Sequence, residues 1–257
     1  MSEQLQWVDT HCHVYDEKIY GGTNAALVAA RAAGVTKIIA IGTDATTSRK
    51  CLDIAISNSD VWATIGLHPH DAKNGFTELL PMLNESKVVG IGECGLDFFY
   101  DHSPRRVQRE LFAQQINLAH ERDLPLVIHT REAWDETFEI LDSVGVPKRT
   151  IMHCFTGGPQ EAEKCLERGA YLSFSGIVTF KTADDVRAAA TMCPIERLLL
   201  ETDAPYLTPM PHRGKPNHPA LVSRVGEYIA DLRGEPVAHI AQHTSRNACL
   251  AFPGIAP

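Results

Sequence analysis

Eight short apolar or β-branched runs recur along the 257 residues, and their spacing constrains the fold more than any other feature. The runs start 32, 24, 27, 37, 25, 20 and 28 residues apart, so each gap has room for one helix. Several runs are apolar on both faces, which suits strands that helices cover on one side and a core fills on the other. The runs are LQWVD at 5, KIIAI at 37, VWATI at 61, VVGIG at 88, PLVIH at 125, TIMHC at 150, AYLSF at 170 and LLLET at 198.

Strands that alternate with helices form a parallel α/β sheet, and eight units is the number that closes a (β/α)8 TIM barrel. An open doubly wound sheet is the competing arrangement. After the eighth run, PYLTPMPHRGKPNHPA carries five prolines and excludes regular structure, and two helical stretches at about 219–233 and 236–250 finish the chain. We therefore predict one (β/α)8 barrel domain over residues 1–257, with an additional C-terminal helix.

The charge balance and the cysteines exclude several classes of protein. Lys and Arg total 24 against 32 acidic residues, a net charge of −8, so any nucleic-acid contact is local. Seven cysteines without a CxxC pair argue against a disulfide framework and against a thiolate zinc site. The start MSEQLQWVDT lacks a signal-peptide pattern, and no apolar run has the roughly 20 residues of a membrane span. We expect a soluble, cytoplasmic protein that uses no membrane.

Side chains with metal-binding chemistry stand where the runs end. A (β/α)8 barrel carries its chemistry at the carboxyl ends of its strands, and period two aims both histidines of HCH at one face. A single histidine there could equally be a hydrogen-bonded core residue, and a single carboxylate could cap a helix. The combination predicts a metal centre at the barrel mouth. Its candidate ligands are His11, His13, Glu93, His129, His153 and Asp203.

Six candidate ligands are too many for one tetrahedral ion, and imidazoles mixed with carboxylates suit hard or borderline divalent ions. One or two ions of Mg²⁺, Mn²⁺ or Zn²⁺ fit such a set. Glu93 can bridge two ions with its two oxygens, because the fourth run lies between runs one and eight on one side and runs five and six on the other. Cys12, Cys94 and Cys154 each follow a candidate ligand, so strand alternation turns them toward the helices as packing residues.

Eight sequence blocks occur in the order seen in a known enzyme family. The blocks are DTHCH, GLHPH, GECGLDFFYD, LPLVIHTREA, HCFTGG, YLSFSGIVTF, LLLETDAPYLTP and PHRGKPNHP. They span nearly the whole chain, which resembles the TatD-type metal-dependent deoxyribonucleases. The resemblance implies an amidohydrolase-like barrel with a one- or two-metal centre that hydrolyses phosphodiester bonds in DNA.

Carried over position by position, the resemblance implies two ligand sets that share a carboxylate. Many amidohydrolase barrels bridge their metals with a carboxylated lysine at strand four, where this chain has Glu93, as the TatD type does. Asp203 would also orient or deprotonate the attacking water. The two sets would be His11, His13, Glu93 and Asp203 for one ion, and Glu93, His129 and His153 for the other.

Several further side chains are candidates for binding the substrate. His68 ends the third run and could bind phosphate, or it could serve as a hydrogen-bonding residue at the strand end. Arg131 could form a bidentate contact with phosphate or a surface ion pair. Arg213 and Lys215 form a local basic patch beside Asp203 that could anchor phosphate, although an isolated loop of this composition is usually solvated.

Two more features accompany the predicted centre. Glu201 shares the strand parity of Asp203, so it faces inward one layer deeper and is expected to support a ligand histidine. Phe98, Phe99 and Tyr100 follow the fourth run, where a ring could stack on a base. We expect two of these three rings to pack under the loop.

Three functions remain open from the sequence. The first is a metal-dependent exonuclease acting on single-stranded or damaged DNA ends, with Asp203, Glu93 and His68 as catalytic residues. The second is a small-molecule hydrolase of esters, lactones or phosphotriesters, which the net charge of −8 favours, whereas the RGK loop and the family blocks favour the first. The third, a non-catalytic barrel, conflicts with the intact carboxylates. DNA is the expected partner, and no obligate protein partner is implied.

Overall fold

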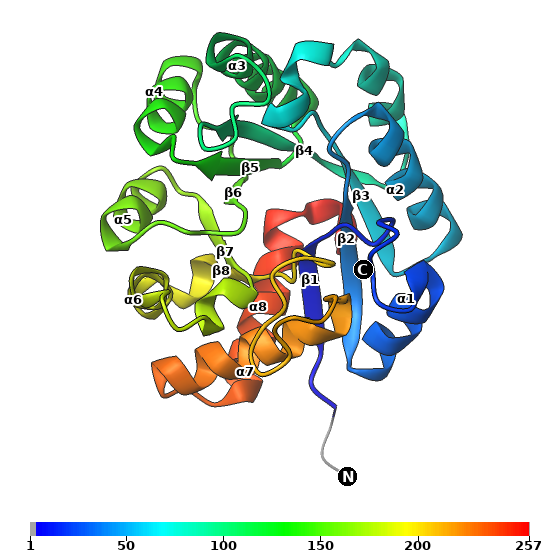
Figure 1. The fold of residues 1–257 in the computed structure, drawn as a ribbon, viewed down its shortest axis with the longest axis vertical. Helices are drawn as coiled ribbons and strands as arrows, with labels where there is room; N and C mark the ends of the chain where they lie inside the picture. The colour runs from blue at the N-terminus through cyan, green and yellow to red at the C-terminus, as the bar shows by residue number, and fades with distance from the viewer. Residues whose placement is uncertain (1–3, 257) are drawn as a thin grey trace.

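The computed structural model describes residues 4–256, and its eight strands form one parallel sheet in the order β1 to β8 (Figure 1). β8 returns to β1, because the N–H of Asp203 donates to the carbonyl of His11 at 2.9 Å and that of His13 to Ala204 at 2.8 Å. The predicted (β/α)8 barrel is therefore confirmed. The strands are β1 Trp7–Cys12, β2 Val35–Ile41, β3 Val61–Ile65, β4 Val88–Asp97, β5 Leu126–Arg131, β6 Thr150–Met152, β7 Tyr171–Phe174 and β8 Leu198–Leu200.

Helices cover the outside of the barrel, with an α-helix after each strand except β3. The β3–β4 connection has room for one helix but holds two 3-10 segments instead, Pro69–Asn74 and Thr77–Asn84. Gly75 follows the first segment and Pro81 lies inside the second, so no continuous α-helix forms between β3 and β4. Among residues 4–256, no helix is long and apolar enough to cross a membrane. The helices are α1 Gly22–Ala32, α2 Ala45–Ser57, α3 Arg105–Arg122, α4 Trp134–Val144, α5 Pro159–Glu167, α6 Asp184–Met192, α7 Val222–Arg233 and α8 Val237–Ala251.

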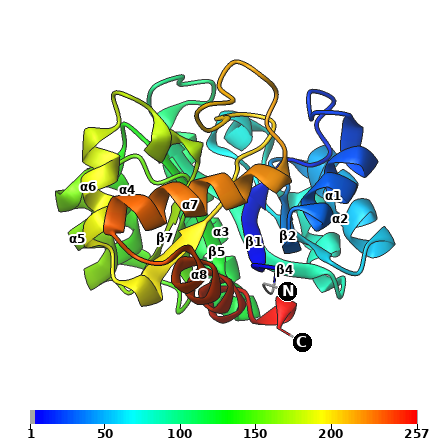
Figure 2. The ribbon, with the colours of Figure 1, turned by 90° about the horizontal axis from the view of Figure 1, so that it is seen from below.

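The additional C-terminal helix, α8, closes the amino-terminal end of the barrel. Phe252 and Ile255, just beyond α8, pack against strand side chains such as Val89 and Val127 in one buried cluster. Asn247 on α8 donates hydrogen bonds of 2.6 Å to the carbonyl of Ile195, just before β8, and of 2.9 Å to that of Leu198, the first residue of β8. Figure 2 shows α8 at one end of the barrel and the loop between β8 and α7 at the other. The carboxyl ends of the strands are thus left free for a site.

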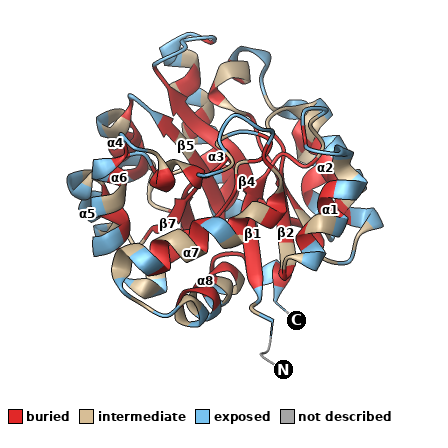
Figure 3. Ribbon diagram, turned by 60° about the horizontal axis from the view of Figure 1, so that its bottom comes forward, coloured by how far each residue is buried: buried red, intermediate tan, exposed pale blue. Residues whose placement is uncertain are grey.

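Four of the five strands that lead to the predicted centre are buried along their whole length, and β5 is the exception. Every residue of β1, β4 and β8 is buried, whereas the helices expose their outer faces (Figure 3). Close packing on both faces restricts the movement of these strands. Side chains at their carboxyl ends are therefore held by a rigid scaffold.

The backbones of β4 and the segment after β3 approach closely beside Glu93. A Cβ added at Gly66 would lie 2.3 Å from the carbonyl carbon of Gly92 and 2.4 Å from its Cα. We expect Gly66→Ala to push these backbones apart and to lower the free energy of unfolding by about 1–3 kcal/mol, measured by urea denaturation. Gly158→Ala is the control, because its nearest neighbours would be 3.4 Å away or more. Equal destabilisation by the two substitutions would contradict this expectation.

Candidate metal centre

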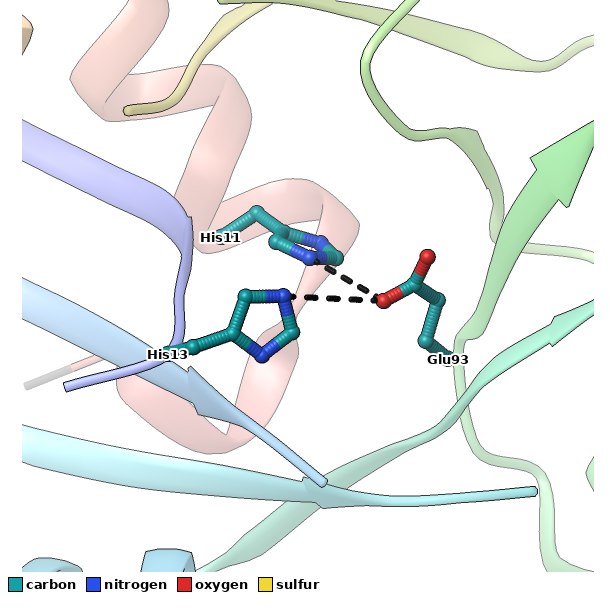
Figure 4. A group of neighbouring side chains, drawn as sticks. All are labelled: His11, His13 and Glu93. Carbon is teal, nitrogen blue, oxygen red and sulfur yellow. Dashed lines mark ion pairs between the residues drawn. The ribbon is translucent and has the colours of Figure 1, made fainter. Parts of the chain in front are cut away.

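Side chains from five strands meet around one carboxylate at the carboxyl end of the barrel. His11 lies within β1 and His13 one residue beyond it, and Figure 4 shows both imidazoles directed at the same oxygen of Glu93. Glu93 itself lies within β4. The remaining predicted ligands are His129 within β5, His153 directly after β6 and Asp203 three residues after β8.

One oxygen of Glu93, Oε2, faces the side chains that come from β1 and β8. It lies 3.4 Å from Nε2 of His11 and 3.8 Å from Nε2 of His13. Oδ1 of Asp203 completes the group, 3.6 Å from the same nitrogen of His11 and 3.3 Å from that of His13. Two ligand atoms about 2.1 Å from one ion lie roughly 3.0–3.4 Å apart, so this group has nearly the spacing of a coordination shell.

The other oxygen of Glu93, Oε1, faces three imidazoles from neighbouring strands. It lies 3.0 Å from Nδ1 of His129, 3.4 Å from Nε2 of His153 and 3.5 Å from Nε2 of His68. The carboxylate therefore separates two groups of side chains and directs one oxygen toward each. This is the position that a bridging ligand requires.

Contacts on the outer nitrogens of His13 and His153 decide where these rings carry their protons. Nδ1 of His13 lies 3.2 Å from the backbone carbonyl of Ile41, and Nδ1 of His153 lies 2.9 Å from Oε1 of Glu201. The carbonyl and the carboxylate accept hydrogen bonds, so each Nδ1 holds a proton, and Nε2 of each ring offers its lone pair toward Glu93 when the ring is neutral, as in a metal-bound state. The hydroxyl of Tyr15 also lies 3.3 Å from Nδ1 of His13. Glu201 thus lies behind a candidate ligand, where strand parity predicts it.

His129 and His11 extend this pattern. Nε2 of His129 lies 3.2 Å from Oδ2 of Asp97 and carries the proton, which leaves the lone pair of Nδ1 facing Glu93. His11 is fully buried, and within residues 4–256 neither of its ring nitrogens finds a hydrogen-bond partner. A buried polar group without a partner costs roughly 1–3 kcal/mol, and a cation at Nε2 would remove this cost for that nitrogen. The donor set therefore fits a divalent metal.

His68 presents a proton to the centre instead of a lone pair. Its Nδ1 accepts a hydrogen bond of 3.2 Å from the backbone N–H of His70, so Nε2, which faces Glu93, holds the proton. Burial lowers the pKa of His68 to about 4, and the ring is neutral at pH 7. This tautomer suits a hydrogen bond to an anion better than a bond to a cation.

Both carboxylates of the centre are ionised. Burial raises the pKa of Glu93, but positive charge on the surrounding imidazoles, that of His153 first, outweighs this effect and holds the pKa well below its usual value. Burial also raises the pKa of Asp203, and the contact with His13 outweighs it, so that the pKa is lowered. Two buried negative charges require positive charge close by, which cations or protonated imidazoles can supply.

Asp97 and His70 are not among the residues that the sequence predicts. Oδ2 of buried Asp97 lies 2.9 Å from Nε2 of His70 and 3.2 Å from Nε2 of His129. Asp97 stands four residues after Glu93 in β4 and shares its strand parity. The alternation of side chains along a strand, which predicts Glu201 as the partner of a ligand histidine, therefore also predicts Asp97.

The cysteines beside the candidate ligands do not all face away from the centre. Cys12 and Cys94 are fully buried in the barrel wall, as expected. Cys154 instead lines the cavity, with its Sγ 3.3 Å from Oγ of Ser175, so the expectation that it packs toward the helices is wrong. β6 ends at Met152 and the φ of Cys154 is 42°, so strand alternation no longer applies at this residue.

The centre opens into a cavity of about 740 Å³, a size that suits a ligand site. Arg131 lines this cavity, and its guanidinium lies 4.1 Å from the ring centre of Phe99 and 4.8 Å from that of Tyr100. Phe98 is buried, whereas Phe99 and Tyr100 are half-exposed. The expectation that two of these three rings pack under the loop is therefore wrong.

The basic loop after β8 lies outside the cavity. Arg213 and Lys215 are exposed, and neither lines the cavity wall. The guanidinium of Arg213 lies 3.8 Å from the ring centre of Phe180, and the N–H of Met210 donates to the hydroxyl of Thr179 at 2.9 Å. These contacts hold the loop against the connection between β7 and α6, so the structure brings Arg131 to the cavity but not the RGK patch.

Known proteins resemble this chain in sequence over nearly its whole length. The model of the TatD related DNase family matches residues 8–253. YabD of Bacillus subtilis, an uncharacterized metal-dependent hydrolase, is 40% identical over 249 residues, which cover 95% of this chain and 98% of that protein. The 3′-5′ ssDNA/RNA exonuclease TatD of Cronobacter sakazakii is 37% identical over 233 residues, 87% of this chain and 89% of that protein.

A solved structure shares the fold as well as the sequence. The crystal structure of YjjV, a TatD homologue from Escherichia coli, matches with a TM-score of 0.91 at 33% identity and covers 99% of this chain and 100% of its own. The likeness therefore includes the barrel and the segments that carry the Glu93 cluster. Since the family model and relatives of this similarity extend over nearly all of its residues, the protein belongs to the TatD related DNase family of metal-dependent hydrolases.

Proposed function

We propose that the protein is a metal-dependent deoxyribonuclease that hydrolyses phosphodiester bonds as an exonuclease on single-stranded or damaged DNA ends. The observation that carries this proposal is the position of Glu93, whose two oxygens face separate groups of side chains. Apart from His68, the side chains of each group can turn lone pairs or charged oxygens toward the shared carboxylate, as a centre for two cations requires.

In this proposal two divalent cations share Glu93. Mg²⁺, Mn²⁺ or Zn²⁺ bound there would activate the attacking water, neutralise the phosphate oxygens and stabilise the leaving alkoxide. The ligands are His11, His13, Glu93 and Asp203 for one ion, and Glu93, His129 and His153 for the other.

Asp203 and His68 act on the reactants directly. Asp203 is ionised and lines the cavity, where its carboxylate takes the proton of the attacking water. His68 is neutral and carries its proton on the nitrogen that faces Glu93, so it donates a hydrogen bond to a non-bridging oxygen of the scissile phosphate.

Three basic side chains outside the centre bind the backbone of the strand. Arg131 lines the cavity and contacts the phosphate next to the scissile one, whereas exposed Arg213 and Lys215 contact phosphates farther away. Contacts of this kind position a strand without reading its sequence. The name of the Cronobacter relative, an ssDNA/RNA exonuclease, supports an unpaired strand as the substrate.

The proposal is tested with purified protein and DNA labelled at its 3′ or 5′ end, both single-stranded and duplex. Mg²⁺, Mn²⁺ and Zn²⁺ are supplied separately after treatment with a chelator. We expect metal-dependent release of nucleotides from the single strand. A complete lack of DNA cleavage with all three metals would overturn the proposal and favour a hydrolase of small esters, lactones or phosphotriesters.

Asp97→Asn is expected to weaken metal binding although it removes no proposed ligand. The carboxylate of Asp97 keeps the proton on Nε2 of His129, and an amide can turn its NH₂ there and reverse the tautomer. We expect the metal concentration for half-maximal activity to rise about 10- to 100-fold, checked by metal titration and calorimetry. Asp101→Asn is the control, since Asp101 pairs with Arg105 at the surface. An unchanged metal requirement in Asp97→Asn would contradict this role.

A further inference from the structure

The exposed aromatic rings of the protein gather at one end of the barrel. Single exposed apolar residues need no explanation, but several rings at the same end of the barrel, two of them lining the cavity, do. All of those found among residues 4–256 lie in loops that follow β1, β4 or β8. They are Tyr20, Phe99, Tyr100 and Tyr206, with exposures of 63%, 50%, 49% and 43%.

The first group, here called the β4 platform, consists of the rings of Phe99 and Tyr100 and the guanidinium of Arg131. Oδ1 of Asp97 accepts hydrogen bonds from the backbone N–H groups of Phe99 and Tyr100, each 3.0 Å long, and so holds the turn that carries both rings. The guanidinium of Arg131 lies 4.1 and 4.8 Å from the two ring centres. The ring of His102 lies parallel to that of Tyr100, with 5.5 Å between the ring centres, and both rings of the platform remain half-exposed and accessible to a ligand.

The second group, here called the β8 platform, consists of Tyr206 and Lys18. The hydroxyl of Tyr206 donates a hydrogen bond of 3.0 Å to Oδ2 of Asp16, which holds the outer edge of the ring. The ammonium group of Lys18 lies 5.7 Å from the ring centre. This platform therefore repeats the combination of a fixed, accessible ring with a cation beside it.

The two platforms stand on different sides of the Glu93 carboxylate. The ring centre of Tyr206 lies 6.2 Å from that of His13, on the Oε2 side. The ring centre of Tyr100 lies 5.5 Å from that of His70. The ring centre of His70 in turn lies 4.3 Å from that of His68, on the Oε1 side. Tyr100 and Tyr206 line the same cavity as Glu93. A phosphodiester that cations hold beside this carboxylate would thus have one ring near each of its two nucleotides.

We propose that the β4 and β8 platforms stack the bases of the two nucleotides that flank the scissile phosphodiester of single-stranded DNA. This inference rests on the proposed nuclease function and adds a binding site for bases to it. Every base presents a π face, so the platforms favour an unpaired strand without selecting a sequence. The cations of Arg131 and Lys18 strengthen the stacking and lie beside the path of the phosphates.

Tyr100→Ala and Tyr206→Ala test the platforms on two strands that share a backbone. One substrate is a single-stranded oligothymidylate, and the other is a strand of equal length made of abasic sites. For each variant we expect the KM of the oligothymidylate to rise about 5- to 150-fold and that of the abasic strand to stay unchanged. Tyr100→Phe retains the ring and is expected to keep the wild-type KM. Ile56→Ala, an exposed position on α2, is the control for loss of surface apolar area.

The outcomes separate this inference from the proposal on which it rests. Alanine variants that leave the KM of oligothymidylate unchanged, or that raise the KM of both strands equally, would overturn the platforms while the nuclease activity stands. Wild-type protein that cleaves no DNA at all would overturn the nuclease proposal itself. Circular dichroism of each variant checks the fold, which substitution of these accessible rings should preserve.

Discussion

Glu93→Gln is expected to lower kcat/KM for DNA cleavage by about 10³-fold or more. Glu93 directs Oε2 at His11 and Oε1 at His129, so both proposed ions depend on it. Glutamine has the same shape but offers one oxygen and one NH₂ group, whose hydrogens would meet lone pairs on one side of the centre. Metal ions supply several kcal/mol of transition-state stabilisation, and each loss of about 1.4 kcal/mol slows the reaction tenfold.

The metal content of the purified variant checks the same prediction without an activity assay. We expect mass spectrometry of dialysed protein to find fewer bound ions in Glu93→Gln than in the wild type, because each ligand set loses the shared negative charge. Glu85→Gln is the matched control, since Glu85 is exposed shortly before β4. A Glu93→Gln protein with the wild-type metal content and rate would exclude the bridging role.

The barrel could be predicted because a short apolar run followed by a gap long enough for a helix occurs eight times. Each apolar run is too short for a helix and too hydrophobic for a loop, and regular gaps between runs require helices on one face and a core on the other. The β3–β4 connection departs from this rule because Pro81 and Gly75 limit it to short 3-10 turns. The gap length alone carries no information about such local interruptions.

The candidate ligands could be predicted because they stand at the ends of the apolar runs. Glu93 follows an apolar run, and that position predicts it at the barrel mouth, although the register of β4 against β5 shifts between Ile91 and Cys94. Strand alternation fails at Cys154, because β6 has already ended and the chain turns the thiol into the cavity. It also says nothing about Arg213, whose position depends on a contact with Phe180 from another loop. Tertiary contacts between loops decide such positions, and one sequence does not encode them in any local pattern.

Asp203→Asn is expected to lower kcat by about 10²- to 10⁴-fold, the usual contribution of a general base. Asparagine keeps an oxygen at the position 3.3 Å from Nε2 of His13, but its amide takes up no proton at neutral pH. The ion proposed on the Oε1 side of Glu93 has no ligand from Asp203 and is expected to stay bound. The variant should therefore retain more metal than Glu93→Gln while its kcat falls, measured by single-turnover cleavage and metal analysis.

Asp71→Asn is the matched control for Asp203→Asn, because Asp71 also lines the cavity but lies outside both proposed ligand sets. A loss of kcat in Asp203→Asn that Asp71→Asn does not share cannot result from the charge of the cavity alone.

Undiminished cleavage by Asp203→Asn would mean that another group takes the proton of the water. Equal loss of metal in Asp203→Asn and Glu93→Gln would mean that the fall in kcat reflects the lost ions, and it would contradict the role of Asp203 as the base. A fall in kcat with the Oε1-side ion retained supports the division proposed here, in which Glu93 assembles the centre and Asp203 moves the proton.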